Sequence, residues 1–528
     1  MQRQYIDEDP QADEKQSGHA GRKVLFVLAC IVLVWLGYVY YMKVAQPHKD
    51  RLAFKITSDN TPLPEKPFLP DISGFTVGMI ASKVPPLSPG RIEQGKLKEY
   101  PEFRKFLEGD TPRRLRLIQR TITPRGLVVQ QGHYDWDSFY REVQAIDPEG
   151  KLISKEGNIY TLRVPLLVYG GASLTISSPQ VEVLRLSKQA NAFLLNAGDF
   201  FILRTKIVGW NEEKNAPTKY SGDKKEYRPF ITTWSGGNLY IAGSVIESLG
   251  YLKGKSYGLS YSNCTPCLKI TPDLPRPTGV VVGNQFIDMY YGFYSYEADD
   301  VAIIGNTYID NIVYGIDPHD RSNRLIIAGN EAYGTKEKHG IIVSREVNDG
   351  WIFNNYSHHN KGSGFMIDRT SVNNVIANNV SVYNGQDGLT LFESEDNIIW
   401  GNRIHNNKRS GIRIRNSWNI KMYNDDIAGN EGASIEVYAA DITGQKTRDF
   451  ELDPYTQKAD LHIEGAKIQA KGVAVFKMNG ADKMTFKNLD VRTATHLFPS
   501  SYVYDNKALR AALGRKNALL EVTVKHSP

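Results

Sequence analysis

The sequence has few cysteines and little excess charge, and both shortages exclude classes of protein. Three cysteines among 528 residues can form neither a disulfide scaffold nor a zinc site with four cysteine ligands. Lysine and arginine total 64 against 58 aspartates and glutamates, and no basic tail is present, so nucleic acid is not an expected partner. Hydrophobic residues make up 41% and aromatic residues 11%, which excludes disorder for most of the chain.

The N-terminal region carries one long apolar segment. Residues 1–22 are polar, and we expect them to form a disordered tail. Between Lys23 and Lys43 lie 19 uncharged residues, enough to span the core of a bilayer, with tryptophan and tyrosine at one end. We predict a transmembrane signal-anchor at 23–43 and an exported body. A cleaved signal peptide is the alternative, but no convincing small-x-small cleavage site follows the segment.

Two of the cysteines, Cys264 and Cys267, form a C-T-P-C pair. A redox motif needs a strand before it and a helix after it. The surrounding stretch is rich in glycine, serine and tyrosine and predicts neither element. A local disulfide or two idle thiols is therefore the preferred interpretation.

A repeat of 22–25 residues dominates the second half of the chain. From about residue 279 to 440, a small residue or asparagine is followed by asparagine, and this second residue advances by 22, 24, 25, 24 and 23 positions. The repeated asparagines are Asn284, Asn306, Asn330, Asn355, Asn379 and Asn402. A glycine keeps the same step at Gly292, Gly315, Gly340, Gly364, Gly388 and Gly411. Two independent landmarks with one period indicate a true structural repeat.

The period and the short strands between these landmarks predict the fold class. One turn of a parallel β-helix suits 22–25 residues, and asparagines at equivalent bends can stack their amides into a ladder. Leucine-rich repeats share the period but need an LxxLxLxxN pattern that is absent, and propeller blades need about 40 residues or more. The sequence therefore predicts an all-β protein, a right-handed parallel β-helix.

Weaker copies of the repeat extend the predicted β-helix to residues 151–495. We expect residues 44–150 to form a linker and an N-terminal cap, with helices near 97–107 and 136–146. Residues 496–528 are predicted to form a C-terminal cap with a helix near 507–513. Both caps follow from the need of a solenoid to cover its ends.

Aligning the coils on the repeated glycine separates core from surface. The strands read GFYSYE, GIDPHD, GIIVSR, GFMIDR, GLTLFE and GIRIRN. Because successive side chains alternate between faces, positions one and three after the glycine are expected in the core, and positions two, four and five outside. The outward set comprises Tyr294, Asp317, His319, Asp320, Ser344, Arg345, Asp368, Arg369, Arg413 and Arg415.

The outward charges suggest a chemistry. Adjacent coils stack about 4.8 Å apart, so His319 and Arg345 can meet beside Asp317. Arginine forks grip carboxylates, and histidine suits proton abstraction. An arginine also offsets the charge that develops when a proton alpha to a carboxylate is removed. On a polyuronate these groups predict C5 deprotonation, followed either by elimination of the glycosidic bond or by reprotonation from the opposite face. A solvated charged face is the plain alternative.

The D-P-H-D-R-S stretch at 317–322, within a parallel β-helix, resembles the signature of the periplasmic mannuronan C5-epimerases of alginate biosynthesis. The resemblance implies conversion of β-D-mannuronate to α-L-guluronate within the alginate polymer, in the periplasm, without metal or other cofactor. It implies that His319 is the base at C5, that Arg345 neutralises the substrate carboxylate and that Asp317 positions substrate or His319. The further outward residues expected to bind polymer are Tyr314, Asp320, Asp368, Arg369, Arg413 and Arg415. For Tyr314, a core or stacking role is the alternative.

Other functions stay open from the residues alone. A polyuronate lyase is the runner-up, and a non-catalytic scaffold in the alginate export machinery would grip the polymer with the same arginines. A glycoside hydrolase needs paired carboxylates, and Asp299–Asp300 and Asp425–Asp426 lie at predicted bends. The absence of G-G-x-G-x-D calcium repeats disfavours the secreted, calcium-dependent epimerases. The resemblance also implies work beside export-complex proteins, and the N-terminal segment predicts attachment to the inner membrane.

Overall fold

A computed structural model describes residues 50–107, 111–234, 236–263, 275–446, 448–472, 474–493 and 496–525. The predicted tail at 1–22, the predicted membrane segment at 23–43 and the Cys264–Cys267 pair lie outside the described residues. Within those residues, every helix is too short or too polar to cross a membrane.

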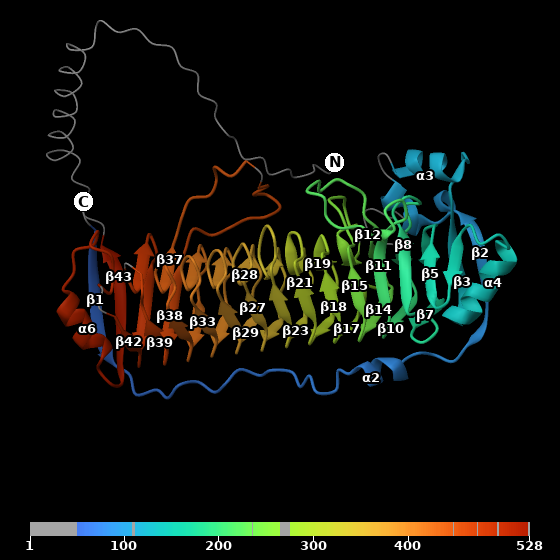
Figure 1. The fold of residues 1–528 in the computed structure, drawn as a ribbon. Coiled ribbons are helices and arrows are strands. Elements are labelled where there is room, and N and C mark those ends of the chain that lie inside the picture. The colour runs from blue at the N-terminus through green and yellow to red at the C-terminus, as the bar shows by residue number, and fades with distance from the viewer. Residues whose placement is uncertain are drawn as a thin grey trace, which may run out of the picture.

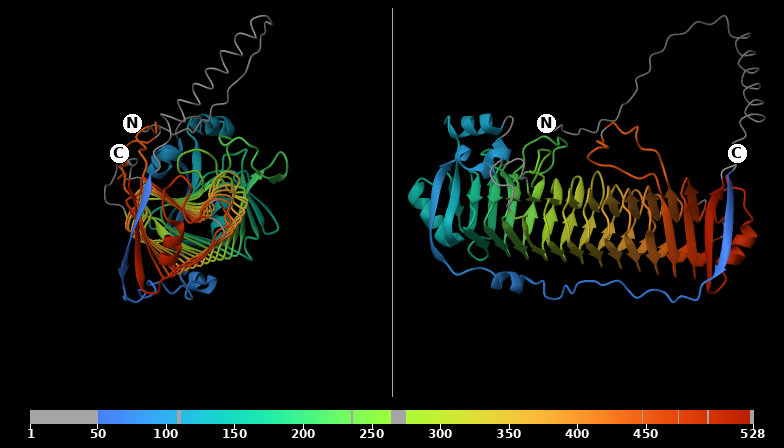
Figure 2. Two further views of the ribbon diagram at one scale, coloured as in Figure 1. Left: turned by 90° about the vertical axis from the view of Figure 1, so that its left-hand side faces the viewer. Right: turned by 180° about the vertical axis from the view of Figure 1, so that it is seen from behind.

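The described chain forms a long parallel β-helix, which confirms the predicted fold class (Figure 1). Each coil contributes one short strand to each of three rows. The end-on view in Figure 2 shows the coils stacked around one axis. We call the three rows the site face, the strap face and the third face.

The site face consists of β6 (Leu166–Val168), β9 (Leu194–Asn196), β13 (Ile231–Trp234), β16 (Gly258–Ser262), β19 (Tyr291–Tyr296), β22 (Tyr314–His319), β25 (Ile341–Ser344), β28 (Phe365–Asp368), β31 (Leu389–Phe392), β34 (Ile412–Arg415), β37 (Ile435–Tyr438) and β40 (Phe476–Asn479). The strap face consists of β7 (Ser173–Ser177), β10 (Asp199–Leu203), β14 (Asn238–Ala242), β17 (Thr278–Val282), β20 (Ala302–Ile304), β23 (Ile326–Ala328), β26 (Trp351–Phe353), β29 (Val375–Ala377), β32 (Ile398–Trp400), β35 (Ile420–Tyr423), β38 (Asp460–Glu464) and β41 (Lys483–Lys487). The third face consists of β5 (Ile159–Leu162), β8 (Val183–Ser187), β11 (Lys206–Asn211), β15 (Val245–Glu247), β18 (Gln285–Ile287), β21 (Thr307–Ile309), β24 (Glu331–Tyr333), β27 (Tyr356–His358), β30 (Val380–Val382), β33 (Arg403–His405), β36 (Asp426–Ala428), β39 (Lys467–Gln469) and β42 (Asp490–Arg492). Two short strands, β4 (Ile153–Glu156) and β12 (Ala216–Pro217), pair antiparallel with β5 and β11.

The interior follows the predicted alternation. The side chains one and three positions after the repeated glycine are buried, including Phe293, Ile316, Ile341, Phe365, Ile367, Leu389, Leu391, Ile412 and Ile414. These apolar side chains stack from coil to coil because each strand pairs in register with its neighbour. The stacked residues form one continuous hydrophobic core along the axis.

The predicted asparagine ladder is present, and we call it the amide ladder. Each Nδ2 donates to the Oδ1 of the next asparagine at 2.9–3.0 Å, from Asn284 through Asn402. The same amides donate to carbonyls of the preceding coil, as Asn355 does to Ile327 at 2.8 Å. The ladder ends on the buried Asp425, which accepts from Asn402 at 2.9 Å. A second ladder, which the sequence analysis missed, joins Asn360, Asn384, Asn407 and Asn430 at 3.0 Å per step.

Both ends of the solenoid are capped. At the N-terminal end, β2 (Ser88–Lys96) pairs antiparallel with β3 (Arg125–Asp135), near η1 (Leu97–Glu99), η2 (Pro101–Leu107), α3 (Thr111–Gln119) and α4 (Trp136–Ile146). Helix α4 occupies the predicted 136–146 and begins where the Asp135 carboxylate accepts from the Ser138 amide at 2.9 Å. At the other end lie α6 (Asn506–Leu513) and β43 (Ala518–Lys525).

An extended segment, residues 59–87, runs along the outside of the strap face, and we call it the strap (Figures 1 and 2). It begins after β1 (Arg51–Ser58), which pairs antiparallel with β43 at the C-terminal end of the solenoid. It includes α2 (Val77–Ser82), whose Ile80 is fully buried. Strap side chains cover an apolar stripe of the strap face.

Candidate active site

The candidate site lies on the site face, centred on β22. Strand pairing sets Tyr296 beside His319, His319 beside Ser344 and Ser344 beside Asp368. These residues therefore form one outward row across consecutive coils, as the alternation predicted. Between β22 and β25 only Ile316–Ile341 and His319–Ser344 pair, which agrees with the interruption expected from Pro318.

Asp320 joins His319 to Arg345. One Asp320 carboxylate oxygen contacts His319 Nδ1, and the other forms an ion pair with Arg345, 3.0 Å from its Nη1. From the sequence we expected His319 and Arg345 to meet on one exposed face, with Asp320 among the polymer-binding residues. The structure instead makes Asp320 the shared partner of the two groups. With Nδ1 occupied, Nε2 is the nitrogen of His319 left to contact a substrate.

The bends that follow the site-face strands are conformationally unusual. Asp320 and Arg345 have φ of +41° and +65°, and Arg369 and Glu393 hold the same left-handed conformation in the next coils. Residues other than glycine adopt this region at a cost of about 1–3 kcal/mol. Coil stacking enforces the conformation through backbone bonds such as Arg345 N to Asp368 O at 3.0 Å. The bends thus hold charged side chains in a fixed row.

The charges around His319 tune its basicity. Burial lowers the pKa of His319, but the adjacent Asp320 and the charge of Asp317 outweigh burial and raise it above its usual value. Burial would raise the pKa of Asp320, yet His319 and Arg345 bring it down to about 2. Asp320 is therefore a permanent carboxylate that makes His319 a stronger base.

Asp317 faces outward by register but is almost completely covered, with 1% of its surface exposed. Burial raises the pKa of Asp317 to about 7, although His319 opposes the shift. One of its carboxylate oxygens is buried and has no hydrogen-bond partner within the described residues. Asp317 is thus a partly protonated group under the site, ready to accept or donate one hydrogen bond.

A cluster of tyrosines borders His319 on its N-terminal side. Tyr257 lies 4.8 Å from both Tyr291 and Tyr294, measured between ring centroids, and Tyr291 lies 5.1 Å from Tyr314. Tyr294 lies 6.1 Å from the His319 ring. Tyr314 therefore packs within this cluster, as its alternative stacking role predicted. It also lies at the edge of the candidate site. Sequence reasoning missed Tyr257 and Tyr291; the tyrosine directly before the repeated glycine in two consecutive coils was the available signal for Tyr291.

The predicted arginines farther along the face all contact protein carboxylates. Arg369 lies 3.5 Å from Asp368 and 3.6 Å from Asp453, and Arg413 lies 3.6 Å from Glu436. Strand β34, which carries Arg413 and Arg415, is four coils beyond β22, about 19 Å along the axis. Asp368 and Arg369 are two coils from His319. These arginines extend the face but do not surround His319.

An insertion between β37 and β38 covers that far end of the site face (Figure 1). Its Arg448 is fully buried and binds Glu393 at 2.8 Å and Asp453 at 3.0 Å. Glu393 also binds Arg415 at 2.7 Å. Sequence reasoning missed Arg448, Glu393 and Asp453, because Arg448 and Glu393 lie 55 positions apart and outside any common repeat.

The aspartate pairs considered for glycoside hydrolysis, Asp299–Asp300 and Asp425–Asp426, are occupied by contacts with other protein side chains. Asp299 and Asp300 bind Arg324 at 3.1 and 2.8 Å, and Asp425 ends the amide ladder in the interior. In the part of the chain that the structure describes, no three histidine, cysteine, aspartate or glutamate side chains are grouped to hold a metal ion. The titratable groups that contact each other at the centre of the site face are His319 and Asp320.

Comparison with known proteins identifies relatives of the chain. The family model described as "Right handed beta helix region" matches residues 291–444, which supports the predicted hand. The mannuronan C5-epimerase of Pseudomonas putida is 42% identical over 408 residues, covering 77% of each chain. The mannuronan C5-epimerase AlgG of Azotobacter vinelandii is also 42% identical, over 77% of this chain and 76% of the relative. A crystal structure of the periplasmic alginate epimerase AlgG superposes with a TM-score of 0.73 at 36% identity, over 80% of this chain and all of that one. The chain belongs to the mannuronan C5-epimerase family.

Proposed function

We propose that the protein epimerises β-D-mannuronate to α-L-guluronate within polymeric alginate. The observation that carries the proposal is the His319–Asp320–Arg345 arrangement on the site face of a family member. A base and a carboxylate-binding cation held by one aspartate are the two groups that C5 deprotonation requires.

The first step assigned to these groups is proton abstraction. His319 Nε2 removes the proton on C5 while Asp320 stabilises the imidazolium that forms. The Arg345 guanidinium keeps donors beyond the Nη1 bound to Asp320, and these pair with the carboxylate of the reacting unit. That pairing offsets the second negative charge that develops on the carboxylate. Return of a proton from water to the opposite face of C5 then inverts the centre without breaking the chain, and His319 releases the abstracted proton to solvent.

The remaining site residues support binding in this proposal. Asp317 supplies a hydrogen bond beneath the reacting unit, and Tyr314 contributes to a wall on which a sugar ring can stack. Asp368, Arg369, Arg413 and Arg415 line the path of the polymer beyond the reacting unit, where the arginines exchange protein carboxylates for those of the substrate.

The cellular setting is proposed on coarser grounds. Similarity to a periplasmic alginate epimerase supports a periplasmic location. The 19 uncharged residues between Lys23 and Lys43 support attachment to the inner membrane, close to alginate export proteins. Fractionation of cells expressing the full chain, followed by washing of the membranes at high salt and high pH, tests the attachment; release of all the protein by the wash would contradict it.

The activity is tested by proton NMR of polymannuronate incubated with the full-length protein in heavy water without added calcium. Guluronate signals with deuterium at C5 and unchanged chain length are expected. Unsaturated chain ends would instead identify a lyase. An unchanged polymer that still binds the protein would identify a binding scaffold and contradict the proposal.

A further inference from the structure

Lys255 lies beside the site without a carboxylate partner. It belongs to the turn before β16, and its Nζ is 3.0 Å from the centroid of the Tyr296 ring and 3.4 Å from the Tyr294 hydroxyl. Tyr296 pairs with His319 in the strand register, and Tyr294 is the ring next to His319. No carboxylate within the described residues lies within 4 Å of Lys255.

The acidic groups near Lys255 are already neutralised by other cations. Glu297 binds Arg321 at 2.7 Å, and Asp320 binds His319 and Arg345. Arg321 also donates to the Tyr296 hydroxyl at 3.1 Å. When protonated, Lys255 is therefore a positive charge with no carboxylate partner within the described residues, and it can pair with the carboxylate of an incoming anion.

The backbone at Lys255 adopts a strained conformation. Lys255 has φ of +66°, a conformation suited to glycine, in a turn closed by the Ser256 amide donating to the Lys253 carbonyl at 2.9 Å. The Lys255 carbonyl accepts from Thr232 Oγ1 at 2.8 Å, which ties the turn to β13. The hydrogen bonds around Lys255 therefore hold its backbone in this conformation.

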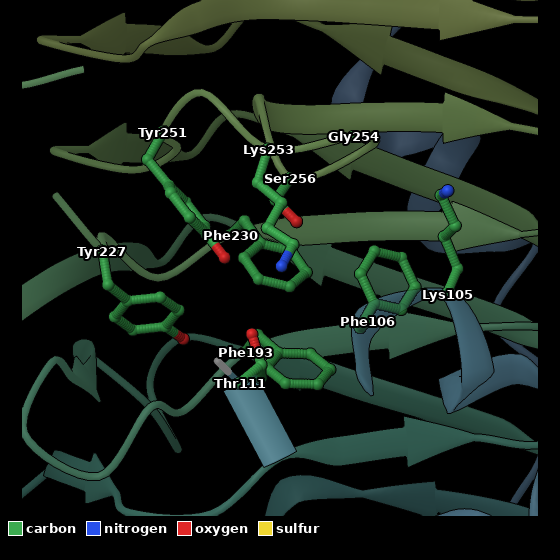
Figure 3. A pocket seen from close by; sticks show the side chains of 10 residues that line it. All are labelled: Lys105, Phe106, Thr111, Phe193, Tyr227, Phe230, Tyr251, Lys253, Gly254 and Ser256. Carbon is green, nitrogen blue, oxygen red and sulfur yellow. The ribbon is translucent and has the colours of Figure 1, made fainter. Parts of the chain in front are cut away.

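The N-terminal cap supports this turn from below. Figure 3 shows a small pocket lined by aromatic side chains between the cap and the turn, with Lys253, Gly254 and Ser256 on one side and Phe106 and Lys105 on another. Phe106 packs on Phe193, Phe230 and Trp234, with ring centroids 5.3–5.8 Å apart. This pocket, about 10 Å³ in volume, is far too small to admit a sugar.

We propose that Lys255 binds the carboxylate of a uronate unit close to the reacting one, on the N-terminal side of His319. Arg345 lies one coil beyond β22 and Lys255 lies over β19, one coil before it. The two cations are therefore about two coil spacings apart, near 10 Å, and flank the base along the solenoid axis. A polyuronate lying along the axis then presents one carboxylate to Arg345 and a nearby one to Lys255. The inference rests on the proposed epimerase function and adds a binding subsite to it.

The proposal predicts a pH signature. Burial lowers the pKa of Lys255 to about 7; the charges of Asp320 and Glu297 oppose this shift, and those of Lys105 and Arg321 add to it. Tyr294 and Tyr296 complete the groups that face the ammonium. In the free protein the lysine is charged below pH 7 and neutral above it, so binding of a carboxylate weakens as pH rises through this range.

The test measures kcat and KM for polymannuronate between pH 5.5 and 9 in the full-length protein. Lys255→Met is expected to raise KM about tenfold or more at pH 6.5, with kcat changed less than threefold, because a charge-assisted hydrogen bond is lost. Wild-type KM should rise above pH 7 by up to tenfold per unit, and this rise should be absent in Lys255→Met. Lys255→Arg should keep a low KM to higher pH, since guanidinium stays charged.

Lys253→Met is the matched control, because it removes the same charge from the same turn on the side of the small pocket. Its KM and pH profile should equal those of the wild type. Wild-type KM and pH profile in Lys255→Met, or a fall in kcat alone, would overturn the subsite. If the wild type forms no guluronate, the proposed function fails; polymannuronate affinity measured by calorimetry at pH 6.5 and 8.5 for the wild type and Lys255→Met then tests the subsite separately.

Discussion

The amide ladder inside the solenoid and the charged row at the bends of the site face have the same stacked geometry. They differ in composition, because one residue type repeats in the ladder and the residue type varies along the row. Both stack one residue per coil, joined by backbone bonds. Inside, the same residue repeats, because each asparagine amide donates to the next and accepts from the one before. Outside, the residues at equivalent bends are Glu297, Asp320, Arg345, Arg369 and Glu393.

The difference follows from charge. Stacked amides are neutral and complementary to their own copies, so identity is favourable. Stacked charges of one sign repel at the coil spacing, so a charged row must pair with opposite charges on neighbouring coils or on insertions. We therefore expect the ladder to govern stability and the row to govern chemistry, and substitutions in the two regions should separate these properties.

The largest effect is expected from His319→Asn. Removing the base should lower the rate of guluronate formation by about 10³-fold, because general bases contribute on the order of 10²–10⁴. The melting temperature should stay within a few degrees, since His319 stands outside the ladder. NMR of polymannuronate and thermal unfolding measure the two properties. Activity close to that of the wild type would remove His319 from the mechanism.

Asp320→Asn should have the next largest effect. It removes the charge that raises the pKa of His319, so the acidic limb of the kcat profile should move to lower pH. The sign follows because His319 must be deprotonated to act, and a lower pKa frees it at lower pH. We expect kcat at pH 8 to fall about 10- to 100-fold, because the weaker base also loses its link to Arg345. An unshifted limb would contradict the assignment of this limb to His319.

Asn379→Ala should lower the free energy of unfolding and leave the specific activity of the folded protein unchanged. The buried Asn379 donates to Asn402 and accepts from the backbone and side-chain amides of Asn355. Its loss leaves these donors unsatisfied and should cost about 3 kcal/mol of unfolding free energy. Denaturant unfolding measures this cost. Specific activity of the folded fraction should match the wild type, and a large loss of kcat would show that ladder and site are coupled.

Asp425→Asn should stabilise the protein at pH 7, by up to about 4 kcal/mol, because a pKa change of one unit corresponds to about 1.4 kcal/mol. Burial raises the pKa of Asp425 to about 7, although its bonds with Asn402 oppose the shift. The folded state therefore keeps a proton that the unfolded chain releases above about pH 4, and stability falls between pH 4 and 7. An asparagine removes this dependence and can donate to the preceding coil as the other ladder amides do. Unfolding at pH 4 and pH 7 should show the gain only at pH 7.

Local repetition explains why so much of the fold was predictable. The spacing of 22–25 positions between successive asparagines from Asn284 to Asn402 predicted the coil length. The alternation after each repeated glycine placed Phe293, Ile316 and Leu391 in the core. His319 and Arg345 were recognised by the same alignment. The alignment did not predict that Asp320 links His319 and Arg345. Alternation predicts which face a side chain lies on but not which neighbouring residue it contacts.

Residues outside the repeat were the ones missed. Arg448 reaches Glu393 from an insertion, and Lys255 reaches the site from a turn supported by the cap. The strap was also not predicted, because β1 pairs with β43, which lies about 470 positions away in the sequence. None of these contacts has a spacing that a periodic pattern could reveal.

The sequence by itself therefore determined the coil, the core, the ladder and the outward position of the catalytic candidates, since each depends on residues within one or two repeats. The tertiary structure decided which charges pair, how Asp317 is covered, where Lys255 lies and how the strap closes the apolar face. Those features depend on distant segments that meet only after the solenoid has formed. Their energies come from burial and charge pairing at contacts that local alternation does not specify.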